Sequence, residues 1–339
     1  MRGITAVVSI ILLLLITISL VGTAFVFIGR TVESSAQTGE EQVKQQTSQI
    51  GILFSIESVD KNHVYIRNAG VTPLQLSSLS FYVNNQKIDA AGPATLATGA
   101  MGEYFLDDAK LAMLPDPATL KISAGAFSQS QDVCFYCKYY AGYWKFDETS
   151  GATAGDSSEN GNDGAYYGKL FNDGDISGGA VQTTGKYGYG MSFDGVNDNV
   201  TINGLKNRGF SNITVSAWVN AKIWSDNAIV SQWGQAGVGW ASFGLSYGSG
   251  KLTFGTYAGS GGSTVVATDY SSTNTWVFVT GQFNGTHCLI YIDGEFKNSI
   301  PCVPPQISTE YPVVIGSVPV GGSYFNGTID EVRIYNRAL

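Results

Sequence analysis

Residues 4–28 contain no charged side chain and are mostly Ile, Leu and Val, and this run limits the architecture of the chain more than any other feature. As a helix, about 25 residues rising roughly 1.5 Å each would cross the ~30 Å hydrocarbon core of a bilayer. A secretory signal peptide has a shorter apolar core, about 7 to 15 residues, and a small-x-small cleavage site. The run is longer and has no clear site, and Arg2 and Arg30 flank it without a strong charge bias, so a plain membrane anchor is one interpretation.

The sequence after this run is still compatible with a helix. No proline interrupts residues 30–49, and Ala36, Val43 and Ile50 are seven residues apart. The pattern therefore predicts one long hydrophobic N-terminal helix over residues 4–50, on the order of 70 Å long, that serves as a membrane segment or filament core.

The N-terminal sequence MRGITAVVSIILLLLITISLVGTAFVFIGR resembles that of archaeal type IV pilins and archaellins. In that family a prepilin peptidase removes a short basic leader that ends in Gly, and the apolar segment then forms the core of a filament. The resemblance implies a leader of residues 1–3, cleavage between Gly3 and Ile4, and a chain that polymerises with copies of itself after insertion in the membrane. Val8 stands where bacterial pilins carry an acidic residue, a change that archaeal relatives tolerate.

The rest of the chain has the composition of β structure. Its 339 residues include 42 glycines, and no long helical period follows residue 50, so we expect two all-β domains. The formal net charge of -8 argues against a nucleic-acid partner, which would require a basic face. The predicted fold class is therefore mainly β with one long N-terminal α-helix.

Residues 51–133 are predicted to form a small β-sandwich. The stretches ILFSIESVD, HVYIRNAG, LSFYVNNQKID and ATLKISAG alternate apolar and polar side chains between turn signals. The phrase VYIRNAGVTPLQLSSLSFYVN resembles the immunoglobulin-like head of archaellins and related pilins, which implies a packing and assembly domain.

All four cysteines lie beyond the apolar run: Cys134, Cys137, Cys288 and Cys302. A chain sent to or across a membrane is expected to form disulfides, and four cysteines allow three connectivities. We favour Cys288 with Cys302, because residues 292–295 read as a hairpin turn. That choice leaves Cys134 with Cys137 in a linker of residues 134–142. A zinc site of four thiolates and a redox-active CFYC motif are less favoured alternatives.

Residues 143–339 read as many short strands separated by Gly, Asn and Asp turns, which is typical of a jelly roll. The phrases FDGVNDNV, VSAWV, IYIDGE and GTIDEVRIYNRAL closely resemble the concanavalin A-like, laminin G-like family. The resemblance implies a jelly-roll sandwich that binds glycans or surface proteins, and a calcium ion near these motifs.

Four residues are the candidate calcium ligands: Asp194, Asn197, Asp198 and Asp330. Calcium takes six to eight oxygen ligands from carboxylates, amides and carbonyls. The first three residues fall within one turn, and Asp330 joins them if the terminal strands lie together. The alternative is that Asp and Asn only stabilise the turn through local hydrogen bonds. Asp156 and Asp163 are weaker candidates.

Exposed aromatic rings are the expected mark of sugar recognition. A Gly- and Ser-rich region contains the candidate ligand-binding residues Trp224, Trp233, Trp240 and Tyr247, followed by Tyr257. The remaining tryptophans, Trp144, Trp218 and Trp276, lie in apolar strand patterns and are expected in the core. Four Asn-x-Thr sequons are candidate N-glycosylation sites: Asn199, Asn212, Asn284 and Asn326.

Catalysis is not expected. A glycosidase places two carboxyl groups about 5 to 10 Å apart around the scissile bond. The pairs Asp147-Glu148 and Asp330-Glu331 are adjacent in sequence, so on a strand their side chains would point to opposite faces. No catalytic residue is predicted.

These patterns predict a pilin-like subunit of an extracellular filament that displays a laminin G-like domain for adhesion to glycans or surface proteins. The alternative is a monomeric, membrane-anchored surface protein that binds or processes glycans. A third interpretation is a structural pilin whose laminin G-like domain only decorates the filament.

Overall fold

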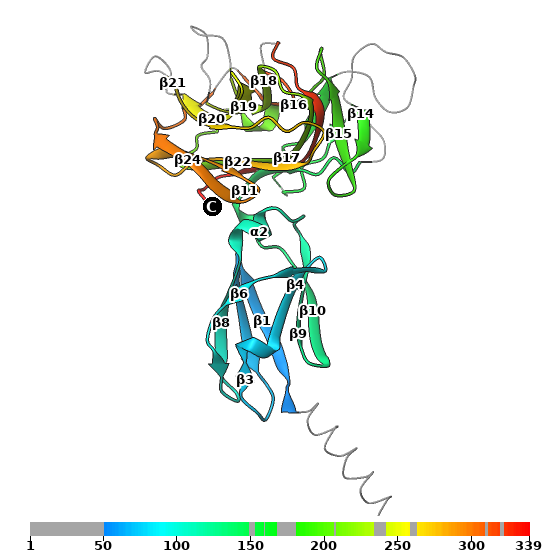
Figure 1. The fold of residues 1–339 in the computed structure, drawn as a ribbon, viewed down its shortest axis with the longest axis vertical. Coiled ribbons are helices and arrows are strands. Elements are labelled where there is room, and N and C mark those ends of the chain that lie inside the picture. The colour runs from blue at the N-terminus through cyan, green and yellow to red at the C-terminus, as the bar shows by residue number, and fades with distance from the viewer. Residues whose placement is uncertain are drawn as a thin grey trace, which may run out of the picture.

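The computed structural model describes residues 51–148, 153–158, 160–167, 181–206, 208–233, 242–257, 263–308, 311–318 and 322–339. These residues form two antiparallel β-sandwiches stacked end to end (Figure 1). The expected small sandwich and jelly-roll sandwich are both present. The second one begins with β11 at Tyr140, inside the stretch predicted as a linker.

The predicted fold class, mainly β with one long N-terminal helix, is corrected by the structure. The described residues are nearly all β-sheet with no long helix among them, and α2, at Asp108–Ala112, has only five residues. The leader, the cleavage site at Gly3 and Ile4, and residues 4–50 lie outside the described residues. In the described part of the chain, no helix is long and apolar enough to cross a membrane.

The first sandwich consists of two four-stranded sheets. One sheet has the order β1 (Phe54–Asp60), β2 (His63–Asn68), β8 (Met101–Leu106), β6 (Ala90–Ala91), and the other β10 (Phe127–Val133), β9 (Ala118–Ala124), β4 (Leu79–Val83), β5 (Gln86–Ile88). A small pair joins β3 (Leu74–Gln75) to β7 (Thr95–Leu96). Strand β9 shows why these segments form strands: Leu120 and Ile122 are buried while Thr119 and Lys121 between them are exposed, which is the period-two pattern of a half-buried strand.

The second sandwich also has two sheets, and we call the one that contacts the first domain the inner sheet. Its order is β14 (Val181–Thr184), β15 (Tyr189–Asp194), β26 (Asn326–Tyr335), β17 (Ile213–Ile223), β22 (Val277–Phe283), β23 (His287–Ile292), β24 (Glu295–Pro301), and β11 (Tyr140–Trp144) also pairs with β26. The outer sheet has the order β12 (Thr153–Ala154), β13 (Gly164–Tyr167), β16 (Asn199–Ile202), β25 (Val313–Ile315), β18 (Asn227–Ser231), β19 (Phe243–Gly248), β20 (Lys251–Tyr257), β21 (Ser263–Asp269). The core lies between the two sheets.

In Figure 1, α2 lies at the end of the first sandwich that faces the second one. Side chains of the inner sheet complete the hydrogen bonding of α2 and of the turn after it. The last carbonyl groups of a helix have no partner within the helix. Here Arg333 on β26 donates to the carbonyl oxygen of Ala112, and its Nη2 donates to that of Leu114 at 2.6 Å. Trp218 Nε1 donates to the Met113 carbonyl at 3.0 Å, so this tryptophan is buried at the junction.

The Arg333 guanidinium is completely buried, and Glu331 balances its charge. Arg333 Nη2 lies 2.5 Å from Glu331 Oε2, and the Tyr143 hydroxyl donates to the same oxygen. A buried ion pair is stable only when further hydrogen bonds satisfy its remaining polar atoms. Because the carbonyls of the α2 turn are among those partners, the pair fixes the two domains to each other.

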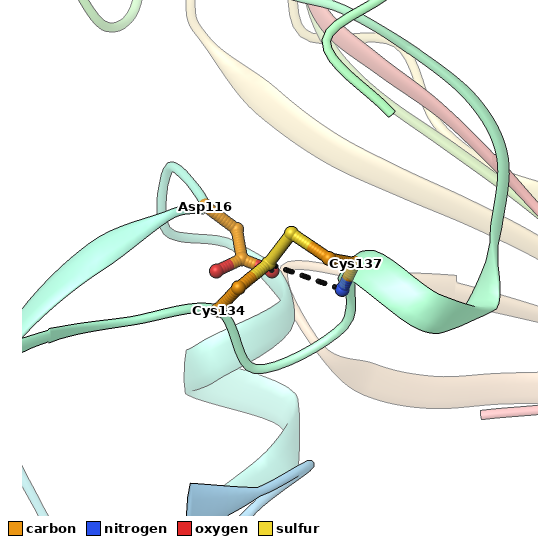
Figure 2. A group of neighbouring side chains, drawn as sticks. All are labelled: Asp116, Cys134 and Cys137. Atoms are coloured by element: carbon orange, nitrogen blue, oxygen red, sulfur yellow. Dashed lines mark hydrogen bonds between the residues drawn. A yellow bond between two sulfur atoms is a disulfide. The ribbon is translucent and has the colours of Figure 1, made fainter. Parts of the chain in front are cut away.

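Both expected disulfides are confirmed. Cys288 pairs with Cys302, and Cys134 pairs with Cys137. Figure 2 shows the second disulfide beside Asp116, a buried carboxylate that accepts the N–H groups of Phe135 at 3.0 Å and Tyr136 at 2.9 Å. The sulfur atoms that a four-thiolate zinc site would need are taken up by these two bonds.

Candidate functional site

The turn at residues 194–198 gathers three of the four candidate calcium ligands. Asp194 Oδ1 accepts the N–H groups of Val196 at 2.7 Å and Asn197 at 3.3 Å. Asp198 Oδ2 accepts the N–H of Asp194 at 2.8 Å, and Asp198 is buried. These local hydrogen bonds stabilise a turn without a metal. Calcium binding by Asp194, Asn197 and Asp198 stays a prediction.

Asp330 is not brought to this turn. Strands β15 and β26 do lie side by side, but their register pairs Asp194 with Asn326. Asp330 follows four residues later on β26, which is roughly 13 Å along a strand. Its Oδ2 instead accepts the N–H groups of Lys186 at 2.8 Å and Tyr187 at 3.0 Å. The carboxylate therefore ties the segment before β15 to β26.

The position of Asp330 predicts a pH-dependent stability. Burial raises the pKa of this carboxyl from 3.8 to about 8, against the lowering effect of the Tyr187 and Lys186 N–H groups. The folded protein then holds a proton that the unfolded chain releases, so this stabilisation is complete below about pH 4 and is lost as the pH rises through about 8.

The test compares melting temperatures at about pH 5 and about pH 8 for the wild type and Asp330→Asn. We expect the wild type to lose several degrees more than the variant between the two values, because the amide side chain cannot ionise. Equal pH dependence of the two proteins would show that Asp330 is ionised in the folded state throughout.

Two of the aromatic candidates are packing residues. The Trp224 ring stacks on Tyr247 with centroids 4.6 Å apart and meets the Tyr270 ring edge-on at 5.7 Å. Trp224 Nε1 donates to the Ser272 carbonyl at 2.7 Å, and Tyr247 is buried. Trp240 lies outside the described residues. Of the expected core tryptophans, Trp144 and Trp218 are buried and Trp276 is half-buried.

Trp233 differs because its ring is both held and exposed. It follows β18, packs on Tyr257 with ring centroids 4.8 Å apart, and keeps 42% of its surface exposed. On β20, Phe254 belongs to the core, so alternation places Gly255 and Tyr257 on the outward face of the outer sheet. Burial raises the pKa of the Tyr257 hydroxyl, which therefore stays neutral under the ring of Trp233.

Two glycines make room for these side chains. Gly244 on β19 pairs with Gly255 on β20, and a Cβ on Gly255 would come within 2.8 Å of a Val265 methyl group. The Tyr257 hydroxyl lies 3.9 Å from the Cβ position of Gly244, so the ring extends over that glycine. Val265, on β21, is 41% exposed. We call Trp233, Tyr257 and Val265 the aromatic shelf.

The Cys288–Cys302 disulfide helps to position the end of β20, which carries Tyr257 of the shelf. The segment after Cys302 bonds to β20 at two points: Thr256 Oγ1 donates to the Val303 carbonyl at 2.5 Å, and Gln306 N–H donates to the Tyr257 carbonyl at 2.8 Å. The disulfide thus anchors a segment that holds the strand end bearing Tyr257.

The shelf lies on the sheet that faces away from the first domain. In Figure 1, β18 to β21 form the upper layer of the second sandwich, and β11, β17, β22 and β24 lie between them and the first domain. Strand β1 starts at the far end of the first sandwich. The start of β1 and the outer sheet are therefore at opposite ends of the described structure (Figure 1).

The four sequons occupy different settings. Asn284 is exposed in the turn between β22 and β23, where its Oδ1 accepts the Thr286 hydroxyl at 3.1 Å. Asn199 and Asn326 are half-buried at the starts of β16 and β26, and Thr214 of the Asn212 sequon is buried. Glycosylation of all four stays a prediction, and Asn284 is the most accessible of them.

Sequence reasoning named Trp233 and Tyr257 but missed Val265 and the role of the glycines. The sequence does contain a signal for Gly255, because in FGTY this glycine stands between Phe254, which faces the core, and Tyr257, which faces outward. Val265 has no such signal, because a valine in a strand is ordinary on either face.

A comparison with known protein families identifies the class of the second domain. Residues 194–339 match the laminin G-type model described as the concanavalin A-like lectin/glucanases superfamily, so the chain carries a laminin G-like, concanavalin A-like domain. The sandwich itself starts earlier, at β11. Comparison with curated proteins gave no match.

Several solved structures resemble part of the chain. Domain 4 of AbnA, an extracellular arabinanase from Geobacillus stearothermophilus solved with arabinotriose, is 19% identical, with a TM-score of 0.45 over 59% of this chain and 94% of that one. The ligand binding domain of botulinum neurotoxin serotype D, solved with N-acetylneuraminic acid, is 17% identical, with a TM-score of 0.45 over 60% and 48%. The binding domain of Paraclostridial Mosquitocidal Protein 1 is 16% identical, with a TM-score of 0.46 over 60% and 50%. The chain thus spans about half the length of these two toxin domains.

Proposed function

We propose that this protein binds carbohydrate through the aromatic shelf of its laminin G-like domain. The observation that carries the proposal is Trp233, a residue that is 42% exposed although Tyr257 packs against its ring. A rigid, exposed ring offers a large apolar contact to the C–H face of a sugar, and little side-chain freedom is lost on binding. The match of residues 194–339 to a lectin-containing superfamily supports the same function.

We propose binding without catalysis. Hydrolysis of a glycosidic bond needs two carboxyl groups at the substrate. Glu331 is buried at the domain junction, and Asp330 is buried against backbone N–H groups. Between residues 227 and 269, which include the shelf, the one acidic residue is Asp269, and Lys251 pairs with it at 2.6 Å. Release of reducing sugar from a bound glycan would contradict this part of the proposal.

The direct test of binding is the variant Trp233→Ala in the full-length, detergent-solubilised chain. We expect its affinity for a glycan identified on an array to fall about 10- to 100-fold, the effect of removing one central aromatic contact. The matched control is Phe296→Ala, since Phe296 is also an exposed aromatic residue, 56% exposed, but lies on β24 of the inner sheet. Equal losses in both variants, or no array binding by the folded wild type, would refute the proposal.

We also propose that the protein acts outside the cell, with residues 1–50 attaching it and the first sandwich holding the shelf away from the attachment point. Two disulfides are consistent with an oxidising compartment. The pilin-like resemblance of the N-terminus extends this to a subunit of a filament. If the native protein is found in sheared cell-surface material and begins at Ile4, the filament is supported. If it stays in the membrane and begins at Met1, the protein is an anchored monomer.

A further inference from the structure

We infer that the aromatic shelf selects neutral oligosaccharides over charged ones and over single sugars. This inference rests on the proposed function and specifies its ligand. Three features carry it: the charge distribution around the shelf, the hydroxyl groups beside it, and its length across the strands.

The strands that carry the shelf, and the sequence between them, are almost free of charged residues. From Asn227 to Asp269 the sequence contains two charged residues, Lys251 and Asp269, and these pair with each other at 2.6 Å. Lys251 starts β20 and Tyr257 ends it, so Lys251 lies roughly 20 Å from Tyr257, and Asp269 lies roughly 13 Å along β21 from Val265. Residues 302–308, which bond to the end of β20, are also uncharged.

Two cations outside this region need separate consideration. Lys206 follows Leu205, whose carbonyl oxygen accepts from Gln232 Nε2 at 3.2 Å, and Gln232 precedes Trp233. Arg208 lies on the loop before β17, with its guanidinium carbon 5.8 Å from the centre of the Phe210 ring, and Phe210 packs in the core against Phe243 of β19. Among the described residues, its guanidinium contacts that ring and no carboxylate within ion-pair distance. The chain as a whole carries a net charge of -8, so an acidic glycan gains no long-range attraction.

Neutral hydroxyl groups are the polar side chains next to the glycine pair. Ser246 and Thr253 lie two residues from Gly244 and Gly255 on the same outward face, and their hydroxyl oxygens are 2.9 Å apart. A hydroxyl group both donates and accepts, as sugar hydroxyls do, and it gives a uronic or sialic acid carboxylate no ionic partner.

The shelf is also longer than one sugar ring. Trp233 follows β18 and Val265 lies on β21, so the shelf crosses three strand spacings, roughly 14 Å in all. Trp233 and Val265, at the two ends of the shelf, are exposed, whereas Tyr257 between them is buried and packs against Trp233. Such a surface fits a chain of sugars laid across the strands, with one unit on Trp233 and a later unit against Val265.

The experiment measures affinities of the full-length protein for galactose, galactotriose and trigalacturonate by calorimetry, and repeats the series with the glucose analogues. We expect a trisaccharide to bind at least tenfold more tightly than its monosaccharide, and the neutral trisaccharide at least tenfold more tightly than the uronate. Raising the salt from about 0.05 to about 0.5 M should change the neutral affinity less than about twofold, because no charges are neutralised on binding.

Two variants make the result specific. Val265→Ala should weaken the trisaccharide and leave the monosaccharide unchanged, and Ile223→Ala, at an exposed apolar residue on the inner sheet, should change neither. Tighter, salt-sensitive binding of the uronate that Arg208→Gln abolishes would overturn the inference while leaving carbohydrate binding intact. No binding of any glycan on the array would instead refute the proposed function itself.

Discussion

Replacing Arg333 with leucine is expected to lower the free energy of unfolding by about 3–5 kcal/mol. The side chain is completely buried, and its loss leaves the Glu331 carboxylate buried without its counter-charge. It also removes the donors to the carbonyl groups of Ala112 and Leu114, which join the domains. Urea denaturation of the full chain, followed by circular dichroism, measures the change.

A double variant and a surface control separate the causes. Arg333→Leu with Glu331→Leu removes both charges, so much of the lost stability should return, because an apolar pair needs no counter-charge. Lys251→Met breaks the exposed pair with Asp269 and should cost no more than about 1 kcal/mol. A double variant as unstable as the single one would show that the interdomain hydrogen bonds, and not the charge, carry the effect.

Removal of the Cys288–Cys302 disulfide is the second large change. The bond closes a sequence separation of 14 residues, for which chain entropy predicts a loss of about 3 kcal/mol in the variant Cys288→Ser with Cys302→Ser. Because the segment after Cys302 holds the strand end of Tyr257, glycan affinity should also fall. Urea denaturation and calorimetry measure the two effects.

The other disulfide is the matched control. Cys134 and Cys137 are three residues apart, so replacing both with serine should cost only about 2 kcal/mol and leave glycan affinity unchanged. If both double variants bound glycan like the wild type, the disulfide would have no role in positioning the shelf.

Local patterns predicted much of the second domain. Short apolar-rich stretches such as VSAWV and IYIDGE, separated by Gly, Asn and Asp turns, indicate strands whatever surrounds them. The hairpin turn at residues 292–295 correctly predicted the Cys288–Cys302 pair, because a hairpin fixes which residues face each other. The long helix over residues 4–50 was predicted from an uncharged apolar run, the absence of proline after it and apolar residues seven apart, and the described structure is nearly all β with no long helix among its residues.

The sequence by itself determined the strands, the turns, the disulfide pairs and the class of the C-terminal domain, since these depend on side-chain periodicity and on residues close in the chain. Only the tertiary structure decided which aromatic rings are exposed to solvent and which are covered by other side chains. Trp224 and Trp233 stand in similar surroundings in the sequence, but Tyr247 and Tyr270 enclose the first ring while Tyr257 supports only one face of the second. Register likewise separated Asp330 from Asp194, because pairing across two distant strands is set by the packing of the whole sheet.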